Sequence, residues 1–316
     1  MAEPDAPFAF PDLAGVPFGL LPHLRRVSVA FAMQPEDRSY KTADGTELPM
    51  RVWRPDRPRA AVLYLHGIQS HAGWYAASSQ FLAESGFAVY QLERRGSGMD
   101  QAHERGHVER AEVWLADVEA AAELARTETG APCVHLLGVS WGGKLAMACA
   151  ARRPELYRSL MLAAPGILSR ISLPLGRQLH VALCLLLRRG RHRFPIPLGD
   201  PALFTANPAR QRYVAEDPLS LREVTARFLY ESRQLDGLAL RAARQVQLPV
   251  FLALAEMDRI INNAATRKLI GAMPARRHRV AAYAGAHHTL EFEPDPSSYF
   301  AELRQWIDEI EAGSRG

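Results

Sequence analysis

The sequence predicts an α/β fold in which a mostly parallel central sheet is flanked by helices. From Ala60 onward, short apolar runs of strand length alternate with longer amphipathic stretches of helical spacing. This alternation is typical of parallel strands joined by crossover helices. The chain has 316 residues, of which 48% are hydrophobic and 23% are charged, so it can bury a substantial core.

The segment before this alternation is predicted to pair antiparallel. A proline-rich arm covers residues 1–25, and residues 27–58 have the pattern of a strand meander. Within the meander, Asp44-Gly45 has the composition of a hairpin turn.

The alternating region then yields its elements in chain order. Strands are expected at residues 61–65, 88–92, 134–137, 159–163, 249–254 and 279–283, and helices near 74–85, 110–128, 142–152, 263–272 and 296–312. The alternation of strands and helices is interrupted after the sixth strand, if the two strands of the meander are counted. We call residues 166–245 the insert; they are rich in leucine and arginine and broken by prolines, which predicts short helices rather than more sheet. Residues 1–165 and 246–316 then form the two parts of the core.

A pentapeptide at residues 138–142, Gly-Val-Ser-Trp-Gly, has the spacing of a nucleophile elbow. It stands between an apolar run and a helix-like stretch, where a strand-to-helix turn is expected. Gly138 and Gly142 would give the turn room, and Ser140 would be exposed as a nucleophile. The spacing alone occurs by chance in about one chain in ten of this length, so the context carries the interpretation.

A serine nucleophile needs a base, and the base needs an acid that orients it. Asp258 follows the strand at 249–254, and His288 follows the strand at 279–283, which is the expected chain order. Both would emerge at the carboxyl edge of the sheet beside Ser140, where open α/β sheets place their sites. His287 and His288 are adjacent, and the spacing does not choose between them.

An oxyanion intermediate needs two backbone donors. Trp141 N–H, at the start of the helix after Ser140, is one candidate. We assign the second to Ile68 N–H, in the loop after the strand at 61–65, with Gln69 as the alternative. His66 is then expected to hold that loop in place.

These motifs resemble the α/β-hydrolase superfamily, and within it the monoglyceride lipase and lysophospholipase-like group also labelled serine aminopeptidase S33. Residues 65–75 resemble the His-Gly oxyanion loop of the group, and residues 93–98 resemble its Asp-x-x-Gly-x-Gly turn. Residues 105–108 and the Asp-Pro-Leu of residues 217–219 also match recurring features. The insert stands where the group carries a helical cap, and the likeness covers most of the chain.

The resemblance implies an esterase or lipase with Ser140, Asp258 and His288 as its triad and without a cofactor or metal. It implies a monoacylglycerol, lysophospholipid or similar linear-acyl ester as substrate. The sequence departs from the group at Glu93, at Met99-Asp100 and at Ala255. Acyl transfer to an alcohol and amide or peptide hydrolysis use the same triad and remain alternatives, as do a non-catalytic ligand-binding protein and an interaction protein acting through the basic insert.

Neither of two other patterns indicates a metal site or a disulfide. Residues 103–107 fit the H-E-x-x-H of zinc proteases, but Gly106 interrupts the helix that this motif requires and no third ligand follows. The cysteines are few, far apart and in apolar surroundings, which predicts buried small side chains rather than a disulfide or metal framework: Cys133, Cys149 and Cys184.

The charge is unevenly placed along the chain. Residues 165–245 contain 13 arginines, no lysine and six acidic residues, a net charge of +7, although the whole chain has +4. A solvated helical surface and attraction to anionic lipid both fit this pattern, and the overall charge is too small to predict nucleic-acid binding. The N-terminus lacks the features of a signal peptide, and the longest apolar run, residues 181–187, is too short to span a bilayer. We expect a cytoplasmic protein, and peripheral membrane contact through the insert stays open as an alternative; the sequence does not predict its oligomeric state.

Overall fold

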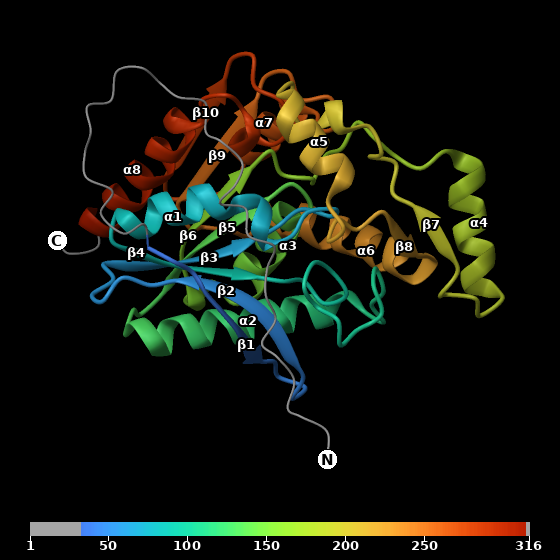
Figure 1. Ribbon diagram of the computed structural model, residues 1–316, viewed down its shortest axis with the longest axis horizontal. Coiled ribbons are helices and arrows are strands. Elements are labelled where there is room, and N and C mark those ends of the chain that lie inside the picture. Colours follow the sequence, from blue (N-terminus) through green and yellow to red (C-terminus); the bar gives the residue numbers. More distant parts are fainter. Residues whose placement is uncertain (1–32, 314–316) are drawn as a thin grey trace.

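The computed structural model describes residues 33–313 and centres on an eight-stranded sheet (Figure 1). The spatial order of the strands is β1-β2-β4-β3-β5-β6-β9-β10. Their bounds are β1 Glu36–Lys41, β2 Glu47–Trp53, β3 Ala60–Leu65, β4 Phe87–Leu92, β5 Val134–Val139, β6 Tyr157–Ala163, β9 Val250–Ala255 and β10 His278–Tyr283.

The predicted mostly parallel sheet is confirmed. Strand β2 pairs antiparallel with β1 and with β4, and every other pair of neighbours is parallel. The hairpin between β1 and β2 turns at Asp44-Gly45, where Gly45 has a φ of 85°. The predicted arm at residues 1–25 and the first residues of the meander, 27–32, lie outside the described residues.

Helices cover both faces of the sheet. In Figure 1, α1 and α8 lie on one side of the sheet and α2 on the other, and contacts join α1 to α8 and α2 to α3. The core helices are α1 Ala76–Glu84, α2 Ala111–Thr129, α3 Trp141–Arg152, α7 Asn263–Gly271 and α8 Ser297–Gly313, with short 3-10 turns η1 Ala72–Tyr75, η2 Pro154–Leu156 and η4 Leu290–Phe292.

The burial of the strands explains their sequences. Every residue of β3, β4, β5 and β9 is buried, as expected for strands covered by helices on both faces. Strand β10 alternates between exposed and partly buried residues, because it lies at the edge of the sheet. Strands β5, β6, β9 and β10 are consecutive neighbours, so the loops at their carboxyl ends meet at one edge of the sheet.

The insert departs from its prediction. Besides helices, it contains an antiparallel pair of three-residue strands, β7 and β8, and one of its helices, α6, has 17 residues. Three residues are too few for a readable alternation, so the sequence pattern did not indicate these strands. The elements are α4 Leu175–Leu186, β7 Arg193–Pro195, η3 Pro201–Leu203, α5 Pro208–Glu216, β8 Glu223–Thr225 and α6 Ala226–Ala242.

The insert lies against the core through α6, which packs on α3, whereas α4 lies at the far end of the molecule from the sheet (Figure 1). No helix between residues 33 and 313 combines the length and the apolar content that crossing a bilayer requires. All three cysteines are unbridged; Cys149 and Cys184 are buried as predicted, but Cys133 is partly exposed because it lies in the loop that enters β5.

Candidate active site

Ser140 occupies a strained turn between β5 and α3. Its φ is 52° and its ψ is −120°, in a region that L-residues rarely adopt. The chain passes so close here that a Cβ on Gly142 would lie 2.4 Å from the carbonyl oxygen of Leu65. The Ser140 carbonyl accepts a 2.6 Å hydrogen bond from Gly166 N–H, which fixes the turn against the loop after β6. The predicted elbow is therefore present, and its glycine is required for close approach.

The structure brings Ser140, His288 and Asp258 into one hydrogen-bonded chain. The Ser140 Oγ lies 2.8 Å from His288 Nε2, and His288 Nδ1 lies 2.8 Å from Asp258 Oδ2. With Nδ1–H donating to Asp258, Nε2 is free to accept the proton of the serine hydroxyl. The ring of His287 faces Glu293 instead, with Nδ1 3.4 Å from Oε1, and the backbone N–H of His287 donates to the same oxygen at 2.8 Å. The geometry therefore selects His288 of the two adjacent histidines.

Asp258 is held as an anion by its surroundings. Burial by itself would raise its pKa, but His288 and two backbone amides outweigh burial and lower the pKa of this carboxyl below its ordinary value. The amides are those of Ile260 and Ile261, which donate to Oδ1 at 2.7 and 3.0 Å. One carboxylate oxygen is thus fixed by the backbone, and the other is left to orient His288.

The two segments that carry the predicted oxyanion donors lie next to Ser140. Trp141 is the first residue of α3, so its N–H has no acceptor within the helix. The loop of Ile68 runs beside the serine, since a Cβ on Gly67 would lie 3.4 Å from the Cβ of Ser140. Arg94 donates to the carbonyl oxygens of Gly67 and Ile68 at 2.9 and 2.8 Å. Because N–H and C=O of a trans peptide point in opposite directions, Arg94 fixes where the following N–H groups point.

Arg94 was not predicted as a site residue. It is buried, and burial lowers its pKa to about 9. Its only sequence signal is its place in the turn at residues 93–98. His66 acts on the same loop, with Nε2 accepting from Arg94 N–H at 3.0 Å and Nδ1 lying 2.8 Å from Gly67 O. Burial holds the pKa of His66 well below its ordinary value, so the ring stays neutral and its predicted structural role is confirmed.

The insert is tied to the oxyanion loop by Asp217. Its Oδ2 lies 2.9 Å from His71 Nε2 and accepts from Trp74 Nε1–H at 2.7 Å. Burial opposes ionisation, but these partners lower the pKa of Asp217 to about 2. Close by, Leu221 N–H donates to the carbonyl of Gln69 at 2.9 Å. The Asp-Pro-Leu motif therefore fastens the insert to the loop that carries Ile68.

Two further contacts bring the insert to the triad. The ring of Phe204 lies edge-on to His288 with centroids 6.0 Å apart, and Phe204 O accepts from Thr289 N–H at 2.9 Å. On α6, Ser232 Oγ accepts from Trp141 Nε1–H at 2.9 Å. Phe204 and Ser232 gave no signal in the sequence, because they are far from the motifs and approach them only through folding.

Glu93, which stands where the related group has aspartate, is fully enclosed. Burial raises its pKa to about 7, and its Oε1 accepts from Ala72 N–H at 3.2 Å. Its longer side chain reaches across the turn, where a Cβ on Gly98 would lie 2.0 Å from Oε2. A side chain at position 98 would therefore collide with the Glu93 carboxylate, and glycine leaves room for it.

The H-E-x-x-H pattern at residues 103–107 lies in a loop, not on a helix. His103 Nδ1 lies 2.8 Å from Asp100, and His107 lies 3.0 Å from both Thr225 Oγ1 and Glu109 Oε1. The two rings have separate partners, so the pattern does not form the site of a zinc protease.

Comparisons with known proteins agree with this geometry. The family model described as serine aminopeptidase S33 matches residues 56–295. The chain is 25% identical to the monoacylglycerol lipase of Mycolicibacterium smegmatis over 86% of this chain and 96% of that protein. It is also 25% identical to the monoglyceride lipase of Rattus norvegicus over 97% and 96% of the two chains.

A solved structure has a similar fold. The soluble variant of monoglyceride lipase from Saccharomyces cerevisiae superimposes with a TM-score of 0.77 at 19% identity, covering 93% of this chain and 99% of that one. Together with the elbow and the sheet topology, the family match leads to one conclusion. The chain belongs to the serine aminopeptidase S33 family and is an ester-cleaving serine hydrolase with the α/β-hydrolase fold.

Proposed function

We propose that Ser140, His288 and Asp258 cleave carboxylic esters through an acyl-enzyme. The observation that supports this most directly is the hydrogen-bonded chain from Ser140 Oγ through both nitrogens of His288 to Asp258. His288 Nε2 takes the hydroxyl proton as Ser140 Oγ bonds to the ester carbonyl carbon, and the imidazolium then gives that proton to the departing alkoxide. A water molecule deprotonated by His288 attacks the acyl-enzyme in the same way, which releases the acid and restores Ser140.

The oxyanion of each tetrahedral intermediate would accept hydrogen bonds from Ile68 N–H and Trp141 N–H. Each such donor typically contributes about 3 kcal/mol to transition-state stabilisation. The positioning of the Ile68 peptide by Arg94 and the place of Trp141 as the first residue of α3 support this assignment. Gln69 N–H remains the alternative to Ile68, because Arg94 anchors the peptide of each.

The proposed substrate is a monoacylglycerol, a lysophospholipid or a similar ester of a linear acyl chain. The monoacylglycerol and monoglyceride lipases that resemble this chain over almost their whole length support it. We propose that the insert, residues 166–245, acts as a cap over the site, because Phe204 lies against His288 and Asp217 against the oxyanion loop.

The insert also has a surface suited to a lipid aggregate. Along α4 and just after it, leucines spaced by three or four residues are exposed to solvent instead of packed: Leu175, Leu179, Leu183 and Leu186, joined by Leu187. Leu175 is 71% exposed and Leu186 is 79% exposed. Exposed arginines surround them: Arg177, Arg188, Arg189, Arg191 and Arg193. An apolar helix face bordered by arginines is typical of interfacial helices that bind anionic membranes, and we propose this peripheral contact here.

The test of the proposed reaction is hydrolysis of p-nitrophenyl esters from acetate to palmitate by the wild type and by Ser140→Ala. We expect turnover by the wild type, a chain-length optimum, and loss of turnover in the variant. Labelling by a fluorophosphonate, detected by mass spectrometry on Ser140, reports the nucleophile independently of the substrate. Retained turnover in Ser140→Ala would refute the assignment.

The same preparation distinguishes the other reactions of this triad. Monoacylglycerol with added short-chain alcohol would yield a new ester if the acyl-enzyme transfers its acyl group to alcohols. The matched anilide series would be cleaved faster than the esters if the enzyme were an amidase. We expect free fatty acid as the main product and esters as the faster substrates.

A further inference from the structure

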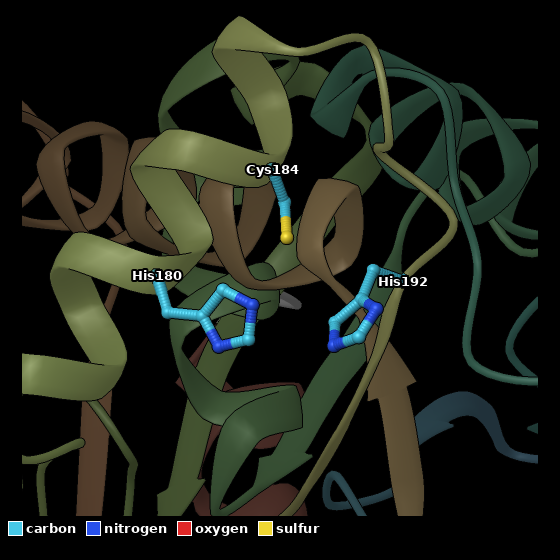
Figure 2. Close-up of side chains that lie close together, drawn as sticks. All are labelled: His180, Cys184 and His192. Carbon is cyan, nitrogen blue, oxygen red and sulfur yellow. The ribbon is translucent and has the colours of Figure 1, made fainter.

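A cluster of three potential metal ligands lies in the insert, outside the candidate active site. It consists of His180 and Cys184 on α4 and His192 just before β7. One ligand atom from each residue lies within 4.8 Å of the other two. Figure 2 shows the two imidazole rings facing each other across a gap, with the sulfur of Cys184 directed toward the same space.

The local fold brings these residues together. His180 and Cys184 are four residues apart, so they lie on the same face of α4 one turn from each other. After the helix, Arg188 adopts a left-handed conformation with a φ of 58°, which reverses the chain. This reversal returns His192 to the side of the helix that carries the other two ligands.

The backbone also fixes His192 independently of any ligand. Arg189 N–H donates to the carbonyl of Cys184 at 2.7 Å, and His192 N–H donates to the carbonyl of Arg189 at 3.0 Å. The carbonyl of His192 accepts from Ala226 N–H at 2.8 Å, which joins it to the first residue of α6. The cluster is therefore preorganised by main-chain hydrogen bonds.

The three side chains are not engaged with other polar groups. Within residues 33–313, none of them takes part in a side-chain hydrogen bond or an ion pair. The two imidazole rings lie 4.9 Å apart between centroids, and both contact Phe194. Cys184 is 4% exposed, whereas both histidines are exposed. The cluster therefore combines one buried sulfur with two solvent-exposed rings.

We propose that His180, Cys184 and His192 bind a Zn²⁺ ion, with water as the fourth ligand on the solvent side. Two imidazoles and one thiolate match the nitrogen and sulfur ligands of zinc, whose bonds are about 2.0–2.3 Å long, so its ligands lie about 3.5 Å apart. The ligand atoms are now up to 4.8 Å apart, and rotation of the two exposed rings would bring them to that distance. The sequence predicts a buried apolar role for Cys184, whereas the two histidines beside it in the fold make it a potential metal ligand.

The bound ion would act as a clip within the insert. It would join α4 to the segment leading into β7. Strand β7 is paired with β8, and β8 is followed directly by α6. Helix α4 carries the exposed leucines, so the ion would fix the orientation of that surface relative to α6. None of the three ligands contacts the triad, and the proposal therefore stands whether or not the proposed ester hydrolysis is correct.

Metal binding to the full chain, stripped of metal and without an affinity tag, tests this proposal. Titration with Zn²⁺ is expected to give one ion per chain by calorimetry and by elemental analysis. Co²⁺ in its place is expected to give the near-ultraviolet charge-transfer band of a cobalt–thiolate bond. His180→Gln, His192→Gln and Cys184→Ser should each weaken binding by about 100-fold or more, because changes even to outer partners of metal ligands cost about 10–100-fold.

Two matched controls exist in the same chain. His278→Gln removes an exposed histidine of β10, and Cys133→Ser removes the partly exposed thiol before β5. Both are expected to retain zinc affinity and the cobalt band. Zn²⁺ should also raise the melting temperature of the wild type and not that of His192→Gln. His180→Gln and His192→Gln change exposed side chains, so their folding is not at risk. Absence of stoichiometric zinc binding in the wild type, or unchanged affinity in these two variants, would overturn the proposal.

Discussion

His71 and Asp217 are 146 residues apart in the chain, and their side chains meet with Nε2 2.9 Å from Oδ2. His71 belongs to the loop that carries the proposed oxyanion donor Ile68, whereas Asp217 belongs to the insert. Both side chains are buried. The contact therefore couples the position of the insert to the geometry of the catalytic edge, although neither residue hydrogen-bonds to Ser140.

Asp217→Asn is expected to lower both stability and ester turnover at neutral pH. The folded-state pKa of Asp217, about 2, lies below its ordinary value of 3.8. The carboxylate thus stabilises the fold above about pH 4, and this contribution is lost as the pH falls toward 2. Urea denaturation of wild type and variant from pH 7 to pH 3 measures the difference, which should shrink at the acid end. A constant difference across this range would contradict the expected ionisation.

His288→Gln is expected to reduce kcat for a soluble ester by about 10⁴-fold or more, because the triad acts as a unit. His287→Gln is the matched control, since it alters the adjacent ring, which faces Glu293 and not Ser140. We expect its kcat to stay within about threefold of the wild type. If His287→Gln were the inactive variant, the assignment of the base would be wrong.

Glu93 and Glu291 should make the protein less stable as the pH rises from 5 to 8. Burial raises the pKa of each from 4.5 to about 7, so the folded protein binds these protons more tightly than the unfolded chain. The stabilisation is full below about pH 4.5 and is lost as the pH rises through 7, by roughly 3 kcal/mol for each group at most. Glu93→Gln and Glu291→Gln should each flatten this dependence in urea denaturation. Glu84→Gln, an exposed control, should leave it unchanged.

Gly142→Ala is expected to disrupt the elbow. The new methyl group would lie 2.4 Å from Leu65 O and 2.6 Å from His66 O, and neither backbone atom can move freely. We expect a loss of stability of about 1–3 kcal/mol and a fall in kcat of about 100-fold or more. Gly271→Ala, at the end of α7 with open space around it, is the control and should be neutral or slightly stabilising. Wild-type kinetics in Gly142→Ala would show that the elbow tolerates a side chain.

Leu179→Gln combined with Leu183→Gln should weaken binding to vesicles that contain anionic lipid. Both side chains are exposed on α4, so their replacement removes apolar area without opening the core. We expect reduced co-sedimentation and reduced turnover of vesicle-borne monoacylglycerol, with unchanged turnover of a soluble short-chain ester. Binding of the wild type should also weaken with salt, because the arginines act through screened charges. Equal vesicle binding by wild type and variant would refute the proposed surface.

The sequence by itself determined the framework and the chemical identities. Buried strands such as β3 and β5 are continuous apolar runs, and Ser140 lies in a Gly-x-Ser-x-Gly spacing that is typical of one kind of strand-to-helix turn. Local patterns were therefore sufficient to predict these strands and the nucleophile. Asp258 and His288 could be assigned because the carboxyl ends of parallel strands converge at one edge. These inferences depend on short-range periodicity and on chain order, which a sequence displays directly.

The residue pattern left His287 and His288 open and the family resemblance implied His288, but only the tertiary structure showed which ring faces Ser140 and which insert residues approach the site. The choice of His288 depends on how the loop after β10 turns, and Phe204 reaches that ring from 84 residues away in the chain. The sequence pattern also did not indicate the strand pair β7 and β8 or the cluster of His180, Cys184 and His192. Contacts of this kind arise when packing brings together segments whose separate sequences carry no shared pattern, so they become visible only once the chain is folded.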